Sequence, residues 1–555
     1  MKKLVALVLA LVLCLGTLAA CRQNPAETTK PAETTKPAET TKPAETTAPP
    51  ETEPAEHINA EFYPISSDHT FKIAVTRTNA EESDNWNLMN EVIGLKTEWQ
   101  IITAEQAPLL FVGDTKDMPD MFMQTGGISQ QQIKEYGQAG LLVNYAEYLD
   151  LMPNLQSWLE KYPDMLSTVV DPEGAFYTLP GYSKTLTAAA NLFYVRTDMT
   201  EAAGIKELPT TVEGFMEMCE TLKEYYKDTE GFHSVMTAHG AASMTYNGAY
   251  SNFFFPAFGD LFKAEITTNA DATEIVAGFA TEQFKHYISF MAELYAKGIM
   301  DPECFTKTSA ETKALHNEGK TIMHPHATQL TPEMFASGEL DFQIYPVVTS
   351  QYTSEAKWFN PKSFAARTYM ISTSCPDIES AVKYMDAYYA TRENPLNEEG
   401  TIWGLSQWLG EYGVDFTVNE EEGWYVITEH EGFDSASAWA HVAGSGSTVV
   451  ADWTYYENGG TGLMKKAIGT RDILMPYGVD IFWIDLLQLT QDEQDTYNDA
   501  WTDLKNYLAE MNAAFITGQK DVEAEWDTYI KTLYDMGLQD IIDVYQAALD
   551  RYNAG

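Results

Sequence analysis

The chain is poor in cysteine and in basic residues, and each shortage excludes classes of protein. It has five cysteines among 555 residues, none in a Cys-x-x-Cys spacing. This predicts neither a disulfide framework nor a zinc site, so we expect buried free thiols. The chain has 35 Lys and Arg against 81 Asp and Glu, which gives a formal net charge of −46. A polyanion of this size is a poor partner for DNA, RNA or anionic lipid, so we expect no nucleic-acid partner.

The apolar run at the N-terminus, Leu4 to Leu15, is too short to span a bilayer of ~30 Å as a helix. Two lysines precede it and a small-residue stretch follows, as in a secretory signal peptide. Residues 18–21 (LAAC) resemble the lipobox of bacterial lipoproteins. That resemblance implies removal of residues 1–20, lipid on Cys21 and a new acylated N-terminus, and two or more acyl chains anchor stably. The alternative is an ordinary signal peptide in which Cys21 is incidental.

The segment after the cysteine, within residues 21–61, is a repeat. PAETTK begins at positions 25, 31 and 37, followed by PAETTA at 43. A proline every six residues blocks helix formation, and Thr, Glu and Lys offer nothing to pack. We expect an extended spacer that reaches ~100 Å from the lipid, at ~3.1 Å per residue. The folded part should begin at residues 62–71.

The folded part alternates strand and helix patterns. Alternating apolar and polar residues predict strands at 71–75 and 97–101, a short apolar strand after 113–120, and a strand at 175–179. Helical patterns cover 85–93 and 155–159. Thr210-Thr-Val-Glu213 and Thr490-Gln-Asp-Glu493 are capping-box patterns, each followed by an apolar helical stripe. This predicts the α/β class with a helical C-terminal region.

Several stretches, taken in order, resemble bacterial extracellular solute-binding proteins of family 1, which serve carbohydrate ABC importers, and in particular their long, oligosaccharide-associated branch. They are GDTKDMPDMF (113–122), GLLVNYAEYLDLMPNL (140–155), DPEGAFYTLPGY (171–182), NLFYVRTDMTEAAGIKELPTTVEGF (191–215), LYAKGIMDPECF (294–305), EGKTIMHPHA (318–327), GTIWGLSQWLGEYGVDFTVNEEEGWYVI (400–427), AAFITG (513–518) and the segment 527–552. No single stretch is specific, but their order and spacing cover nearly all of residues 70–552.

The resemblance implies a two-lobed periplasmic-binding-protein fold of type II with extra C-terminal helices. Lobe 1 is expected at 62–186 and 366–470, and lobe 2 with the helical C-terminal region at 187–365 and 471–555. Candidate crossovers lie at 182–190 and 365–372. The implied protein is a monomeric, lipid-anchored binder on the outer face of a bacterial cell membrane. It would take up a carbohydrate by lobe closure and deliver it to ABC permease subunits.

Aromatic residues beside polar ones, outside any helical or strand periodicity, are the candidate sugar-binding residues. Sugars present flat C–H faces to aromatic rings and hydroxyls to Asp, Asn or Glu. The candidates are Asp84, Asn85 and Trp86 after the first strand, Tyr246, Asn247 and Tyr250 in a glycine-containing loop, and Trp403, Trp453 and Tyr455 in the later half. For each, packing in the core is the competing interpretation.

Enzyme and metal motifs are weak. Ser83-Asp-Asn85 and Ser354-Glu-Ala-Lys357 match parts of a serine-enzyme signature, but their order is reversed and no Lys-Thr-Gly follows. His324-Pro-His326 has no third metal ligand at a sensible spacing. No Asp-x-Asp-x-Asp-Gly calcium loop occurs, although some alginate-binding relatives carry one. We therefore expect no catalytic residues, no metal site and no cofactor.

Two other functions remain open. A surface hydrolase that processes glycans would release reducing ends from oligosaccharides. A peptide-binding lipoprotein of the same fold would suit the strong negative charge, because cationic peptides would be attracted to it.

Overall fold

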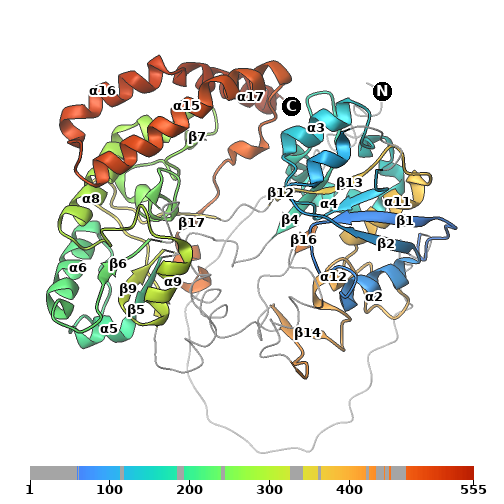
Figure 1. Cartoon of the computed structure of the whole chain (residues 1–555), viewed down its shortest axis with the longest axis horizontal. Helices are drawn as coiled ribbons and strands as arrows, with labels where there is room; N and C mark the ends of the chain where they lie inside the picture. Colours follow the sequence, from blue (N-terminus) through green and yellow to red (C-terminus); the bar gives the residue numbers. More distant parts are fainter. Residues whose placement is uncertain are drawn as a thin grey trace, which may run out of the picture. The chain divides into compact units, whose positions relative to one another are not determined.

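The computed structural model of the chain describes residues 59, 62–112, 118–183, 193–238, 244–325, 342–360, 364–420, 424–432, 443, 449–451 and 470–554. Its strands and helices alternate along the first two thirds of the chain, and three long helices end it (Figure 1). This is the α/β order that the sequence predicts, including the helical C-terminal region.

The first sheet has the strand order β13-β3-β1-β2. β1 (Thr70–Val75) is parallel to β2 (Lys96–Ile101) and to β3 (Met121–Met123), and β13 (Tyr369–Ile371) returns antiparallel to β3. The associated helices are α2 (Asp84–Ile93), α3 (Gln130–Gln138), α4 (Pro153–Lys161), α11 (Ile378–Asp386) and α12 (Ser406–Leu409). β3 and the last three residues of β1 are buried because these two strands lie inside the sheet.

The second sheet has the order β10-β5-β9-β6. Its strands are β5 (Tyr194–Arg196), β6 (Ser234–Met236), β9 (Thr321–His324) and β10 (Phe342–Ile344), of which only β6 and β9 pair in parallel. The helices of this region are α5 (Thr197–Ala202), α6 (Val212–Tyr226), α7 (Ala249–Phe254), α8 (Glu282–Ala296) and α9 (Ser309–Asn317).

A third sheet lies where the chain passes between the two regions. β4 (Leu179–Ser183) pairs antiparallel with β12 (Phe364–Arg367) and parallel with β16 (Val450–Ala451). We call this the connecting sheet, because each of its strands is followed or preceded by a passage into the second region. Three further short pairings complete the strands of the described residues: β7 (Ile266–Thr268) with β8 (Ile275–Ala277), β11 (Trp358–Phe359) with β17 (Gly478–Val479), and β14 (Phe416–Asn419) with β15 (Trp424–Ile427), besides isolated bridges.

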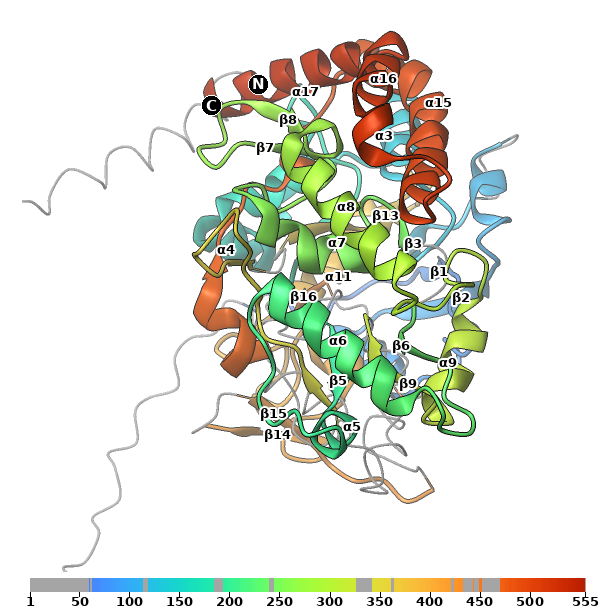
Figure 2. The same ribbon diagram turned by 90° about the vertical axis from the view of Figure 1, so that its left-hand side faces the viewer.

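The C-terminal helices are α15 (Gln491–Ile516), α16 (Val522–Asp535) and α17 (Leu538–Ala554), and they pack on one another and on α8. Figure 2 shows β7 and β8 beside α17. Leu504, Leu508 and Met511 of α15 are buried, as the apolar stripe of the sequence predicts. The predicted capping box is also present: Thr490 and Glu493 satisfy each other's backbone N–H groups at the start of α15.

Two large hydrophobic cores hold these regions. The first core contains buried residues of 63–182 and 369–450, and the second contains buried residues of 193–359 and 474–549. Cys219, Cys304 and Cys375 are buried free thiols, which confirms the prediction for these three. Burial raises the pKa of each thiol, to about 12 for Cys304 and Cys375, so they are poor nucleophiles.

Two local predictions were wrong. Residues 175–178 are not a strand, and β4 begins at Leu179, because only from there does the chain pair with β12. The cap of α6 is Thr211 and not Thr210. The reason is that Thr210 and Val212 exchange backbone hydrogen bonds with Thr349, which holds the chain extended through Thr211.

Within the described part of the chain, no helix combines the length and the apolar character that a membrane crossing requires.

Candidate functional site

The carboxyl ends of the parallel strands in the first sheet point to a binding site. β1, β2 and β3 end at Val75, Ile101 and Met123, at the same edge of the sheet. In open α/β sheets, ligands bind outside the carboxyl ends of the strands. The described residues that follow these ends are therefore the first place to look for ligand contacts.

Four polar side chains meet at this edge, and we call them the edge network: Thr76, Gln124, Tyr369 and Gln407. Thr76 Oγ1 donates to the carbonyl of Gln124 at 2.8 Å, and Gln124 Nε2 donates to the Tyr369 hydroxyl at 3.0 Å. Gln407 Nε2 donates to the same hydroxyl at 3.1 Å. Tyr369 and Gln407 are buried, whereas Thr76 and Gln124 are half-buried. The edge network therefore contains two side chains at the strand ends that solvent can reach, Thr76 and Gln124.

The backbone at the end of β3 is unusual. Gln124 has a φ of 49°, a left-handed conformation that costs energy for a residue other than glycine. Gly127 follows with a φ of 85°, and a Cβ there would lie 1.9 Å from the carbonyl oxygen of Ala104. Strained backbone of this kind concentrates at functional sites, which supports a binding role for this turn.

The three candidates after β1 occupy different environments. Asp84 is exposed in the first turn of α2. Asn85 is buried, and its Nδ2 donates to the carbonyl of Trp408 at 2.6 Å. Trp86 is fully buried, 4.6 Å from the ring of Trp99. A backbone hydrogen bond therefore occupies Asn85, and packing covers Trp86, whose Nε1 has no hydrogen-bond partner among the described residues.

The Arg77 guanidinium lies 5.7 Å from the centre of the Trp86 ring. Burial lowers the pKa of Arg77. Because Arg77 follows β1 directly after Thr76, it places a positive charge beside the edge network, between the buried indole and solvent. The sequence analysis selected Trp86 as a candidate because it is an aromatic residue beside polar ones. In the structure Trp86 is fully buried, whereas Arg77 is half-buried.

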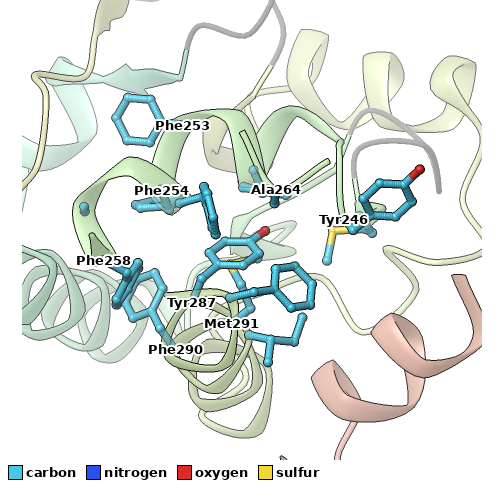
Figure 3. Close-up of a cluster of buried hydrophobic side chains, with 14 of the residues drawn as sticks. Tyr246, Phe253, Phe254, Phe258, Ala264, Tyr287, Phe290 and Met291 are labelled. Carbon is cyan, nitrogen blue, oxygen red and sulfur yellow. The ribbon is translucent and has the colours of Figure 1, made fainter. Parts of the chain in front are cut away.

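The three candidates of the second region also differ in burial. Tyr246 is buried, with its ring edge-on to Phe279 at 5.4 Å, and burial raises its pKa (Figure 3). Tyr250 is fully buried and donates its hydroxyl to the carbonyl of Thr237 at 2.6 Å. Asn247 is exposed, and its Oδ1 accepts from Thr245 Oγ1 at 3.0 Å. Of these three, only Asn247 presents its side chain to solvent.

The candidates of the later half are Trp403, Trp453 and Tyr455. Trp403 is buried beside Tyr412 and Phe416, at ring distances of 5.5 and 5.4 Å. Trp453 and Tyr455 lie outside the described residues. A ligand contact by any of the nine sequence candidates remains a prediction.

A pocket of about 480 Å³ is lined by residues from α3, the connecting sheet and the segment before α15. Thr178, one of its lining residues, accepts from the backbone N–H of Tyr369 at 3.2 Å. Lys134 Nζ donates to the carbonyl of Leu489 at 2.9 Å, and Gln488 Nε2 donates to the carbonyl of Ser167 at 3.0 Å. None of the described sequence candidates lines this pocket.

No group of three or more His, Cys, Asp or Glu side chains suited to a metal occurs in the described part of the chain. His324 is buried with its ring 3.9 Å from that of His316, and His326 lies outside the described residues.

The sequence reasoning missed Gln124, Tyr369 and Gln407. The signal for Gln124 was present, since a Gln-Thr-Gly-Gly turn follows an apolar strand at its carboxyl end. Tyr369 and Gln407 gave no such signal, because they come from segments more than 240 residues further along the chain, and only folding brings them to Gln124.

Comparisons with known proteins concern the family and the fold. Residues 109–394, slightly more than half of the chain, match the family described as bacterial extracellular solute-binding protein. The fructooligosaccharide ABC transporter substrate-binding protein FusA of Streptococcus pneumoniae is 21% identical over 462 residues, which are 79% of this chain and 81% of the relative.

Two solved structures resemble the fold over most of its length. The S. pneumoniae FusA complex with kestose has a TM-score of 0.68 at 18% identity and covers 88% of this chain and 100% of its own. The HMO-binding solute-binding protein of Bifidobacterium longum infantis has a TM-score of 0.68 at 16% identity and covers 88% and 99%. The two-lobed, type II periplasmic-binding-protein fold expected from the sequence is thereby confirmed.

Proposed function

Because the chain belongs to the bacterial extracellular solute-binding proteins, we propose that it captures a carbohydrate of oligosaccharide size and delivers it to an ABC permease. Family membership makes it a transport binding protein and not an enzyme, so a glycan-processing hydrolase is no longer an alternative. It also supports a location outside the cytoplasm.

The carbohydrate class rests on similarity along the chain. The relative that matches most of both chains is named for fructooligosaccharides, and the solved neighbours include complexes with sugars. The edge network adds a chemical argument, because amide, hydroxyl and phenol groups at the carboxyl ends of β1 and β3 suit sugar hydroxyls. Peptide binding is the second candidate, supported only by the net charge of −46.

Each proposed lobe of this protein contains one of the two large hydrophobic cores. Lobe 1 is proposed at 62–186 and 366–470 and lobe 2 at 187–365 and 471–555, divisions that the chain ranges of the two cores support. Ligand would bind next to the connecting sheet and draw the lobes together. Ligand binding would favour the closed form, and the permease would recognise that closed form.

The attachment of the protein is also proposed. Residues 1–20 would be removed, Cys21 would carry lipid, and the spacer within 21–61 would hold a monomeric binder near permease subunits in the same membrane. The short distance raises the effective concentration of loaded binder at the permease.

Calorimetry of the purified protein against a panel of oligosaccharides and a pool of cationic peptides tests the function. We expect at least one oligosaccharide to bind and to raise the melting temperature, without release of reducing ends. Heat from the peptides and from none of the sugars would replace carbohydrate by peptide as the ligand class.

Gln124→Ala tests the location of the site. Gln124 is half-buried on a turn, so the substitution should cost little stability but weaken sugar binding about tenfold, the equivalent of ~1.4 kcal/mol. Gln138→Ala, at an exposed position of α3, is the matched control and should leave the affinity unchanged. Equal affinities of the two variants would place the ligand away from the edge network.

A further inference from the structure

Arg367 lies just beyond the edge network, on the connecting sheet. It pairs with Leu179 at the end of β12, two residues before Tyr369. Tyr369 pairs with Met123, the last residue of β3, and the two strands are antiparallel. The chain before Tyr369 therefore continues past the carboxyl end of β3, which puts Arg367 where a ligand of this fold is expected.

The Arg367 side chain lies across the backbone of β4 at Gly181. A Cβ on Gly181 would be 2.4 Å from Arg367 Nε and 2.8 Å from its Cγ. Any side chain at position 181 would therefore displace the guanidinium. Glycine at this position leaves room for Arg367 to reach over the strand.

The guanidinium has no partner among the described residues. Its Nε is buried without a hydrogen bond, and no carboxylate of the described residues forms an ion pair with it. Burial lowers the pKa of Arg367, while the Tyr369 and Tyr389 hydroxyls act in the opposite direction and no carboxylate contributes. The positive charge is thus held in a polar but uncharged surrounding.

Three other arginines of the described residues are paired with carboxylates. Arg196, Arg392 and Arg551 each form an ion pair, with Asp198, Glu420 and Glu493 respectively. With 81 carboxylates for 35 cationic side chains, pairing is the default for a cation. Arg367 is half-buried, with its Nε out of contact with water. Partial removal of a charge from water without a counter-charge costs free energy, so an unpaired one at a binding edge calls for a ligand group that offsets this cost.

We propose that Arg367 binds the carboxylate of an acidic saccharide, so that the ligand of this site is an oligosaccharide that contains uronic acid. This deepens the proposed function and depends on it. The planar guanidinium presents two parallel N–H donors that match the two oxygens of a carboxylate. The hydroxyls of a neutral sugar would satisfy the donors but leave the charge unbalanced.

Matched ligands test the charge requirement. The probes are di- and trisaccharides of uronic acids in several linkages, each compared with its methyl ester, which keeps the shape and removes the charge. Titration at 0.15 M salt screens the distant field of the polyanion. We expect the best acid to bind at least tenfold more tightly than its ester. An ester or neutral panel that binds as tightly as the acids would overturn the inference but keep the carbohydrate function, whereas binding of no saccharide would overturn both.

Substitutions assign the effect to Arg367. Arg367→Gln should lower the affinity for the acid to that for the ester and leave the ester unchanged, and Arg367→Lys should keep part of the difference. Arg392→Gln removes another arginine of the same region and should change neither affinity. An acid preference that survives in Arg367→Gln would assign it to a different cation.

The melting temperature without ligand gives an independent readout. Because the charge is unpaired, Arg367→Gln should leave the melting temperature unchanged or raise it by about 1–2 °C. Gly181→Ala should displace the guanidinium and reduce the acid preference with Arg367 still present. A fall of several degrees in Arg367→Gln would show that Arg367 has a structural partner, and would overturn the inference.

Discussion

At the scale of single residues, burial distinguishes the aromatic candidates of this protein. Trp86, Tyr250 and Trp403 attract attention as rings among polar neighbours, yet all three are buried. In this structure each of these rings packs against other side chains, as Trp86 does against Trp99 and Trp403 against Phe416. A ligand contact by any of them stays a prediction.

Trp86→Ala should therefore act on stability. The substitution leaves a cavity next to Trp99 and removes the ring beneath Arg77, so we expect a loss of ~3–5 kcal/mol in the free energy of unfolding. Chemical denaturation measures the loss, and Trp86→Phe should restore part of it. A variant of unchanged stability that binds sugar weakly would instead make Trp86 a ligand contact.

At the scale of elements, the predicted ends that depend on nearby residues were confirmed and those that depend on distant pairing were not. The capping box of α15 depends on residues three apart, and it is present as the sequence predicts. β4 starts later than predicted because its partner β12 comes more than 180 residues further along the chain. The local rule succeeds where local groups satisfy one another, and it fails where pairing is distant.

Thr490→Ala should cost about 1 kcal/mol of stability, because it leaves a backbone N–H at the start of α15 without an acceptor. Glu493 also forms an ion pair with Arg551 of α17, so Glu493→Gln should loosen both helices. Urea denaturation gives the change. Thr496→Ala, at an exposed position within α15, is the control and should change stability little.

The contact between α9 and β9 predicts a pH dependence. His316 is buried next to His324 and Thr321, and burial lowers the pKa of His316 to about 3. The unfolded chain binds a proton near pH 6.5, whereas the folded chain keeps His316 neutral, so stability is lost as the pH falls below about 6.5.

The part of this loss due to His316 should reach about 3 kcal/mol at pH 4 and disappear in His316→Gln. Denaturation at pH 7 and pH 4 measures it. His286→Gln, on α8, should retain the full loss. If His316→Gln loses as much stability between the two pH values as the unchanged protein, then His316 is not the titrating group.

At the scale of the whole molecule, the proposed attachment makes the sharpest prediction. Cys21→Ala should release the protein into the medium, because the acyl chains would have no thiol and no processed N-terminus to join. Sugar binding by the released protein should be unchanged. Cell fractionation measures the release, and calorimetry measures sugar binding. A Cys21→Ala variant that stayed in the membrane would contradict lipid attachment at Cys21.

The order of strand and helix patterns predicted the α/β class, and the resemblance of the stretches along 70–552 predicted the two-lobed fold and the family. Both depend on local sequence and its order, and the fold is shared with solved structures that are 15–18% identical.

Only the tertiary structure decided which polar groups meet at the sheet edge. Gln124, Tyr369 and Gln407 are distant in the chain, and so are Gly181 and Arg367. Their contacts follow from the pairing of β13 with β3 and of β12 with β4, which no local pattern encodes. The same pairing left the Arg367 guanidinium beside the strand ends.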